Sequence, residues 1–144
     1  MYKLYYWTGI PGRGEFVRLA LEAAGAKYQD VARQKGDGVI EAFGAKVRTP
    51  SFAPPYLVDG DIVVGQTAAI LHYLGPTLGL VPRDPRLRLW VHQIQLTIAD
   101  FVVEAHDSHH PVGSSLYYEQ QKPEAKRRAR EFRRERVPKF MGWF

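Results

Sequence analysis

The stretch PPYLVDGDIVVGQTAAIL, residues 54–71, predicts two short strands, a tight turn and the start of a helix. Its two β-favouring runs are separated by Asp59-Gly60, where glycine accepts the positive φ that a hairpin turn requires. Gln66 and Thr67 follow the second run and begin an apolar segment with helical spacing. The stretch therefore predicts an antiparallel hairpin that leads directly into a helix.

Gln66 and Thr67 place polar side chains where a strand hands over to a helix N-terminus. Free N–H groups and the helix dipole make such a position a site for an anion, for example a carboxylate. Alternatively, the Thr67 hydroxyl only caps the helix. The segment alone supports both interpretations equally.

Length and composition limit the possible classes of protein. The 144 residues are enough for one ordinary domain, or for a small domain and part of a second, and the hydrophobic content of 45% permits a packed core. The absence of cysteine excludes disulfides, thiolate metal sites, a cysteine nucleophile and a CxxC redox motif. No apolar run reaches the length of a membrane span, and the N-terminus lacks the apolar core of a signal peptide, so we expect a cytoplasmic protein.

The residues before the hairpin predict a strand, a helix and a second strand. Residues 3–7 are rich in β-formers, a loop dense in glycine and proline follows, and residues 13–24 have apolar positions at helical spacing. Residues 27–31 form a plausible second strand, which favours a parallel pair with a right-handed crossover. Between this strand and the hairpin the chain is polar and hard to assign, and only residues 39–43 suggest a short helix.

The pattern changes to all-helix after residue 77. We predict an α/β domain over residues 1–77 with the order β-α-β-α-β-β-α and a mixed four-strand sheet. A proline-containing linker over 78–85 then leads into an all-α region over 86–144. The first helix of that region, 86–105, has an apolar stripe formed by Leu87, Val91, Ile94, Ile98, Phe101, Val102 and Ala105.

Asp100 lies just off this stripe, between Ala99 and Phe101. A carboxylate so close to apolar residues is costly to bury unless it is paired. The alternative is that Asp100 lies on the solvated edge of an amphipathic helix.

Several motifs, taken in order, resemble a cytosolic glutathione S-transferase of the tyrosine type (mu, pi, alpha or sigma). They are a Tyr-Trp pair at the end of the first strand, the helix start at residues 12–18, and the segments 55–60 and 66–71. Each motif is weak alone, but their order and spacing together are fairly specific. The resemblance covers essentially the whole chain. The resemblance implies a thioredoxin-like N-terminal domain followed by the start of the family's all-α domain.

The resemblance also implies roles for individual residues. Tyr6 matches the catalytic tyrosine, and Pro55 matches the cis-proline that shapes the glutathione site. Gln66 and Thr67 match the Gln-Ser pair that holds the γ-glutamyl carboxylate. Asp100 resembles an acidic residue that, in some classes, reaches the γ-glutamyl amine across a dimer interface.

The chemistry of glutathione fits a tyrosine at this position. A thiol with a pKa near 8.5 is only a few per cent thiolate at neutral pH, and a hydroxyl donor aimed at the sulfur increases that fraction. Tyr5 and Tyr6 point to opposite faces of their strand, so spacing alone does not choose between them, and Tyr6 could instead be a core aromatic. A mechanism through the Thr8 hydroxyl is a further alternative.

Other parts of the glutathione site are less well defined. Trp7 lines the site or packs beneath it, and the glycyl carboxylate requires a cation, for which Lys46 is a candidate beside Lys35 and Arg48. In the family the residue before the cis-proline pairs with the cysteinyl backbone through its N–H and its C=O. Pro54 has no N–H, so only its carbonyl could serve.

The resemblance implies a homodimeric enzyme that transfers glutathione, as co-substrate and without a prosthetic group or metal, to small hydrophobic electrophiles. Peroxidase or isomerase chemistry would use the same activated thiolate. Family members continue through several more helices, so we expect an incomplete helical domain with some apolar surface left uncovered. This makes a non-catalytic module that binds glutathione, another ligand or a protein the main alternative.

Two further alternatives come from the helical region. The basic segment between Lys126 and Arg136 could bind nucleic acid, but interleaved glutamates favour a solvated helix, and we expect no nucleic-acid or membrane partner. A metal site could form from the cluster between His106 and His110, but Pro111 follows at once and no HExxH pattern exists.

Overall fold

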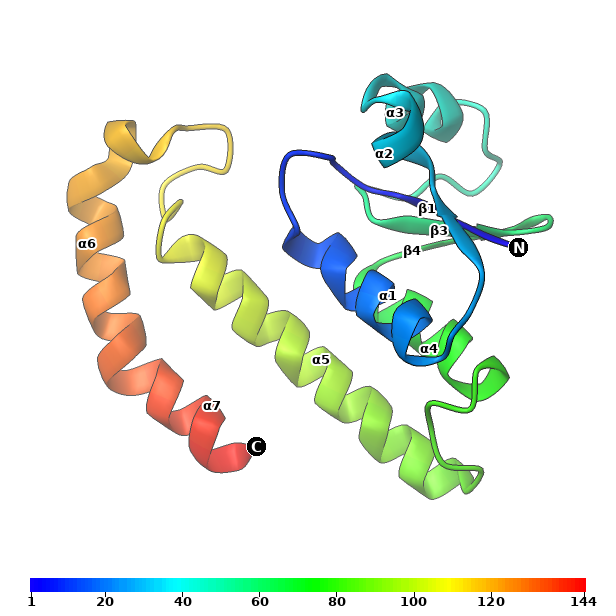
Figure 1. The fold of residues 1–144 in the computed structure, drawn as a ribbon. Coiled ribbons are helices and arrows are strands. Elements are labelled where there is room, and N and C mark those ends of the chain that lie inside the picture. Colours follow the sequence, from blue (N-terminus) through cyan, green and yellow to red (C-terminus); the bar gives the residue numbers. More distant parts are fainter. The chain divides into compact units, whose positions relative to one another are not determined.

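A computed structural model describes residues 1–144, which form two compact units, Met1–His92 and Gln93–Phe144. Helix α5 (Pro85–Asp107) begins in the first unit and ends in the second, as its course in Figure 1 illustrates. None of the helices is long and apolar enough to cross a membrane.

The first unit is a mixed sheet with helices on both faces. Its elements are β1 (Tyr2–Tyr5), α1 (Gly12–Ala23), β2 (Tyr28–Asp30), α2 (Val31–Lys35), α3 (Gly38–Gly44), β3 (Tyr56–Asp59), β4 (Ile62–Gly65) and α4 (Thr67–Thr77). The strand order is β2-β1-β3-β4, with β1 parallel to β2 and antiparallel to β3, and β3 antiparallel to β4. This confirms the predicted thioredoxin-like order and the hairpin at Gly60, whose φ is +58°.

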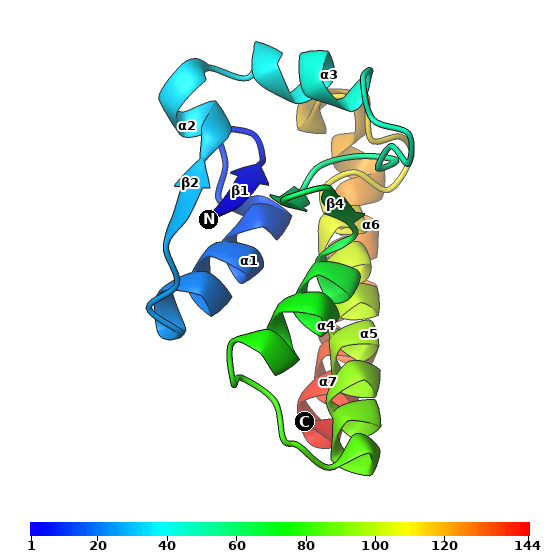
Figure 2. The same cartoon turned by 90° about the vertical axis from the view of Figure 1, so that its right-hand side faces the viewer.

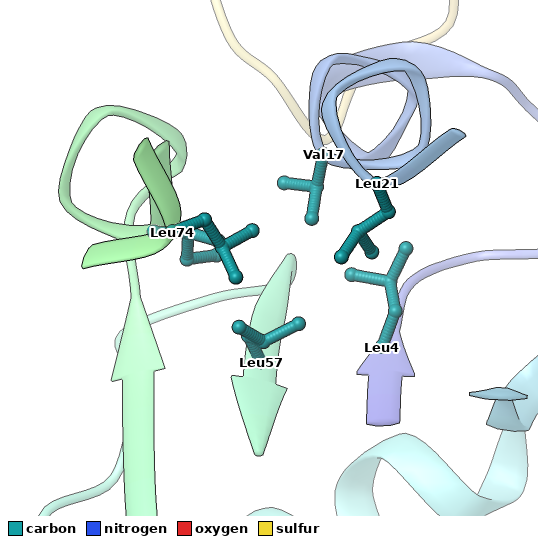
Figure 3. Close-up of a cluster of buried hydrophobic side chains, with 6 residues drawn as sticks. Leu4, Val17, Leu21, Leu57 and Leu74 are labelled. Atoms are coloured by element: carbon teal, nitrogen blue, oxygen red, sulfur yellow. The ribbon is translucent and has the colours of Figure 1, made fainter. Parts of the chain in front are cut away.

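Two apolar clusters hold the sheet, one on each face. Helices α1 and α4 cover the first cluster, in which Figure 3 shows the side chains converging. The first cluster consists of Leu4, Val17, Leu21, Leu57, Ile70 and Leu74. Helices α2 and α3 cover the second cluster on the other side of the sheet, which Figure 2 shows in profile. The second cluster consists of Tyr5, Val31, Ala32, Ile40, Tyr56 and Val58. Alternation along β1 and β3 therefore sends consecutive residues into opposite clusters.

The segment that was hard to assign contains two short helices. Helix α3 includes the predicted residues 39–43, whereas α2 was not predicted. Asp30 begins α2 as its N-cap, since its carboxylate accepts the Arg33 N–H at 3.4 Å. The first strand ends at Tyr5 rather than at Trp7.

The second unit consists of the end of α5 and a nearly continuous helical rod. The rod is formed by η1 (Tyr118–Gln121), α6 (Lys122–Glu131), the π-helical segment η2 (Phe132–Arg136) and α7 (Val137–Trp143). The Phe101 ring of α5 contacts those of Phe132 and Phe140, with centroids 5.7 and 4.7 Å away. The residues of the apolar stripe predicted for α5 are only half-buried or exposed, and no residue of this helix is fully buried.

Candidate functional site

Tyr6 lies just beyond β1, beneath the start of α1. Its side chain is 5% exposed, and a Cβ at either Gly12 or Gly14 would overlap with it. The two glycines of the sequence Gly12-Arg13-Gly14 therefore allow the backbone of α1 to approach the phenol ring closely. Both interpretations of Tyr6 are compatible with this position, since the residue is packed like a core aromatic and stands at the end of a strand.

The hydroxyl of Tyr6 is held by the backbone. The Arg13 N–H donates a hydrogen bond to the Tyr6 oxygen at 3.0 Å. Because the hydroxyl accepts this bond, its own proton stays available for an acceptor outside the fold. The arrangement orients a phenolic donor at the carboxyl end of β1, an interior strand of the sheet.

The backbone of Arg13 also contacts the N-terminus of α4. The Thr67 hydroxyl lies 3.4 Å from the Arg13 carbonyl oxygen, to which it donates. Thr67 is the first residue of α4 and makes no capping bond to its own helix, so the cap interpretation is wrong. The backbone N–H and C=O of one residue, Arg13, thus link the Tyr6 hydroxyl to the helix start that was predicted to bind a carboxylate.

Gln66 and Pro55 have unusual backbone geometry next to this point. Gln66 has a φ of +63° and is the one non-glycine residue with a positive φ. Such a conformation costs about 1–3 kcal/mol and concentrates at functional sites. The Pro54-Pro55 bond is cis, as the resemblance implies, and Pro55 is buried at the start of β3.

The residues around Tyr6 separate into different environments. Tyr5 is buried on the other face, where its ring stacks on Phe43 and Tyr56 at centroid distances of 4.7 and 4.8 Å. Trp7 packs against the same second cluster and is half-buried. Thr8 is exposed, and its backbone N–H donates to Asp37 Oδ1 at 2.9 Å. The structure therefore brings Tyr6, and not Tyr5, to the backbone that Thr67 contacts.

The remaining predicted residues are not drawn into this arrangement. Lys46 is exposed, as are the alternative cations Lys35 and Arg48, so the choice among them stays a prediction. Asp100 belongs to the second unit, where it lies exposed on α5. The site of the first unit is therefore built without it.

The histidines of the second unit do not form a metal centre. The His106 and His110 rings lie 5.0 Å apart, but no group of three or more potential ligands is placed to bind a metal ion. The Nδ1 atom of His110 instead faces the Leu116 carbonyl oxygen at 3.2 Å and the side-chain amide of Gln121 at 3.3 Å.

Two residues of the site were not assigned a role from the sequence. Arg13 contributes its backbone N–H and C=O, for which the flanking glycines were the signal in the sequence. Arg18 is 3% exposed and donates to Asp30 Oδ2 at 2.7 Å, beneath the Tyr6 ring. Burial by itself lowers the pKa of Arg18, but hydrogen bonds to Asp30 and Glu15 outweigh this effect and raise it.

Comparison with known proteins identifies both halves of the chain. Residues 2–75 match the glutathione S-transferase N-terminal domain, and residues 106–144 match a glutathione S-transferase C-terminal domain. Glutathione S-transferase 1 of Ascaris suum is 38% identical over 104 residues, which is 72% of this chain and 48% of that protein. The class-mu 26 kDa isozyme of Schistosoma mansoni is 31% identical over 101 residues, 68% of this chain and 50% of that protein.

Solved structures of glutathione S-transferases are also similar to this chain in fold. The glutathione S-transferase of Ascaris lumbricoides superposes with a TM-score of 0.58 at 35% identity, over 72% of this chain and 48% of its own. Prostaglandin synthase D of Nilaparvata lugens covers 100% of this chain and 66% of its own with a TM-score of 0.73; at 22% identity it shows the fold alone. The chain spans about half the length of the curated relatives it matches. The two matched domains and these similarities show that the chain belongs to the glutathione S-transferase family.

Proposed function

We propose that this protein binds glutathione and transfers its thiolate to small hydrophobic electrophiles. The observation that carries the proposal is the hydrogen bond from the Arg13 N–H to the Tyr6 hydroxyl, at 3.0 Å. Because the Tyr6 oxygen accepts this bond, its own proton is left for the glutathione sulfur. A hydrogen bond from a hydroxyl to an anion such as the thiolate contributes about 1.5–3 kcal/mol. The bound thiol then ionises more readily than free thiol.

The transfer itself needs only the activated sulfur. The thiol proton leaves to solvent, the thiolate attacks an electrophilic carbon, and a C–S bond forms as the leaving group departs with its electron pair. Tyr6 is neutral throughout and acts as a hydrogen-bond donor to the sulfur. Its fixed position removes the need to reorient a donor when the charge develops.

The γ-glutamyl carboxylate is proposed to bind at the start of α4. The N–H groups of the first helical turn, beginning at Thr67, have no acceptor within the helix, and the dipole favours an anion there. Because the Thr67 hydroxyl proton is directed at Arg13, the donors left for a carboxylate are these N–H groups and the Gln66 amide. The Pro54 carbonyl is proposed to accept the cysteinyl N–H.

The finer assignments extend the same proposal. Lys46 is proposed for the glycyl carboxylate, Trp7 for the wall of the site, and Asp100 for the γ-glutamyl amine in a homodimer. A role in cytoplasmic detoxification would follow from this chemistry. Each of these assignments rests on the family resemblance of the residues concerned.

Calorimetric titration with glutathione, followed by ultraviolet titration of the bound thiol, tests the proposal. We expect saturable binding that weakens in Gln66→Ala, and a bound thiol with a pKa below that of free glutathione. Tyr6→Phe should retain binding and lower the rate of conjugation to a dinitrohalobenzene by roughly 10–100-fold, the equivalent of one charged hydrogen bond. Thr8→Ala is the matched control and should leave the rate unchanged.

The alternative outcomes separate the candidate functions. Saturable binding without conjugation would favour the non-catalytic module, whereas the missing N–H of Pro54 would weaken the binding itself, because it removes one donor to the cysteinyl backbone. An unchanged rate in Tyr6→Phe together with a large loss in Thr8→Ala would transfer the catalytic role to Thr8. Absence of binding by a demonstrably folded chain would overturn the proposal.

A further inference from the structure

Arg18 is a buried arginine at the centre of a polar cluster in α1. Its Nε donates to Asp30 Oδ2 at 2.7 Å, at the end of β2, and its Nη1 donates to Glu15 Oε2 at 3.0 Å. The same Nη1 lies 3.5 Å from the Pro11 carbonyl oxygen. Charged side chains are rarely buried to 3% exposure, so this position calls for a specific reason.

The cluster lies against Tyr6. The guanidinium carbon of Arg18 is 5.8 Å from the centroid of the Tyr6 ring, within the range of a cation–π contact. Arg18 also contacts the carbonyl of Pro11, two residues before the Arg13 N–H that binds the Tyr6 hydroxyl. Arg18 therefore contacts both the ring of Tyr6 and the turn that orients its hydroxyl.

Stability alone explains this cluster poorly. The Nη2 group of Arg18 is buried and makes no hydrogen bond, and an unsatisfied buried donor is costly. Buried ion pairs can often be replaced by apolar residues without loss of stability. The planar fork of arginine, however, spans Asp30, Glu15 and Pro11 at once, which a lysine ammonium cannot do.

We propose that Arg18 is a positioning residue for Tyr6, holding the phenol ring and the Pro11–Arg13 turn so that the hydroxyl proton faces the bound thiol. The inference rests on the proposed function, because the thiol is the ligand proposed for Tyr6. In this proposal the buried guanidinium of Arg18 fixes the orientation of the Tyr6 hydroxyl and does not itself bind glutathione.

Arg18→Lys is the variant of choice, because it keeps the positive charge and removes the fork. The matched control is Arg33→Met, since Arg33 pairs with the same Asp30 carboxylate at 3.5 Å but is 49% exposed and lies in α2. Two readouts in the full chain decide the matter: the pKa of glutathione thiol bound to the protein, and the carbon-13 resonance of the Tyr6 ring, assigned with Tyr6→Phe.

In Arg18→Lys we expect the Tyr6 resonance to move and the thiolate fraction at neutral pH to fall roughly threefold, half a pKa unit. Affinity for glutathione should change less than this fraction, and Arg33→Met should move neither readout. A folded Arg18→Lys chain with an unchanged resonance and an unchanged thiol pKa would overturn the inference.

Two further measurements keep the test decisive. If Arg18→Lys does not fold, Glu15→Gln weakens one anchor of the fork at a partly exposed carboxylate, and should move both readouts in the same direction by less. An unmoved resonance in that variant also overturns the inference. If the parent chain binds no glutathione, the proposed function fails, yet a Tyr6 resonance that moves in Arg18→Lys and not in Arg33→Met still supports the positioning role.

Discussion

Each of the two units of this chain is stabilised internally by a different kind of interaction. In the first unit, apolar clusters on the two faces of a sheet include six side chains each, and Leu4, Val17, Leu21 and Ile70 are fully buried or nearly so. In the second unit, ion pairs and polar side-chain hydrogen bonds make many of the stabilising contacts. Glu104 of α5 pairs with Arg128 and Arg136, and the buried Gln121 side chain binds the loop before η1. A glutathione site that needs fixed geometry is proposed for the unit with the denser apolar core.

The largest expected effect is a loss of stability when the apolar core of the first unit is truncated. Leu21→Ala removes a fully buried side chain of α1 from the first cluster and leaves a cavity, so we expect a loss of about 2–4 kcal/mol in the free energy of unfolding. Leu19→Ala in the same helix is the control, because Leu19 is 60% exposed, and should cost little. Chemical denaturation measures both, and an equal loss in the two variants would contradict the assigned core.

The strands and the hairpin of the first unit are the part of the molecule that sequence patterns predict well. The β-favouring runs and the Asp59-Gly60 turn are local signals, and the structure confirms the mixed four-strand sheet and the hairpin that they predict. Helix α2 was not predicted because it is only five residues long and its N-cap, Asp30, is also the last residue of a strand. Short helices of this kind depend on tertiary packing more than on propensity.

Polar residues that are buried for tertiary reasons could not be predicted. Arg18 follows the spacing of α1, yet its burial depends on Asp30, which is twelve residues away. Gln121 is 1% exposed because its amide accepts the N–H of Val112 and donates to the carbonyls of Gly113 and Leu116. Of the candidate site, the resemblance implied Tyr6, Gln66 and Thr67, whereas the Arg13 backbone that links Tyr6 to Thr67 depends on tertiary structure that local patterns do not encode.

The second expected effect is a loss of stability of the first unit at alkaline pH. Tyr56 is 4% exposed and donates to the Ile40 carbonyl oxygen at 2.6 Å, and burial raises its pKa from 10.0 to about 12. The folded protein thus favours the neutral phenol. The contribution of this neutral side chain to the free energy of unfolding is complete below pH 10 and is lost as the pH rises toward 12. At 1.36 kcal/mol per pKa unit, this linkage contributes at most about 3 kcal/mol to the free energy of unfolding.

Unfolding followed by circular dichroism from pH 8 upward tests this expectation. Tyr56→Phe cannot ionise at this position, so its stability should fall less steeply above pH 10 than that of the parent, although it starts lower because the bond to Ile40 is lost. Some slope will remain, since burial also raises the pKa of Tyr5. Parallel curves for the two proteins would show that Tyr56 does not carry the alkaline transition.

The smallest expected effect is on the polar side, and it has the opposite dependence on pH. Hydrogen bonding to Arg136, with further help from Arg128, lowers the pKa of Glu104 against the raising effect of burial. The carboxylate therefore stabilises the second unit fully above the ordinary glutamate pKa and ceases to do so as the pH falls through its lowered value. Glu104→Gln should unfold at a lower temperature at pH 7 and should lose the acid dependence that this group confers.

Glu135→Gln is the control for this last variant, because Glu135 pairs only with its neighbour Arg134 on the exposed face of η2. It should leave the acid limb unchanged. Thermal unfolding of both variants between pH 3 and 7, followed by amide exchange in α6, separates the second unit from the first. If Glu104→Gln retained the parent's acid limb, the second unit would depend on its phenylalanine contacts rather than on its ion pairs, and the contrast between the two units would be one of degree.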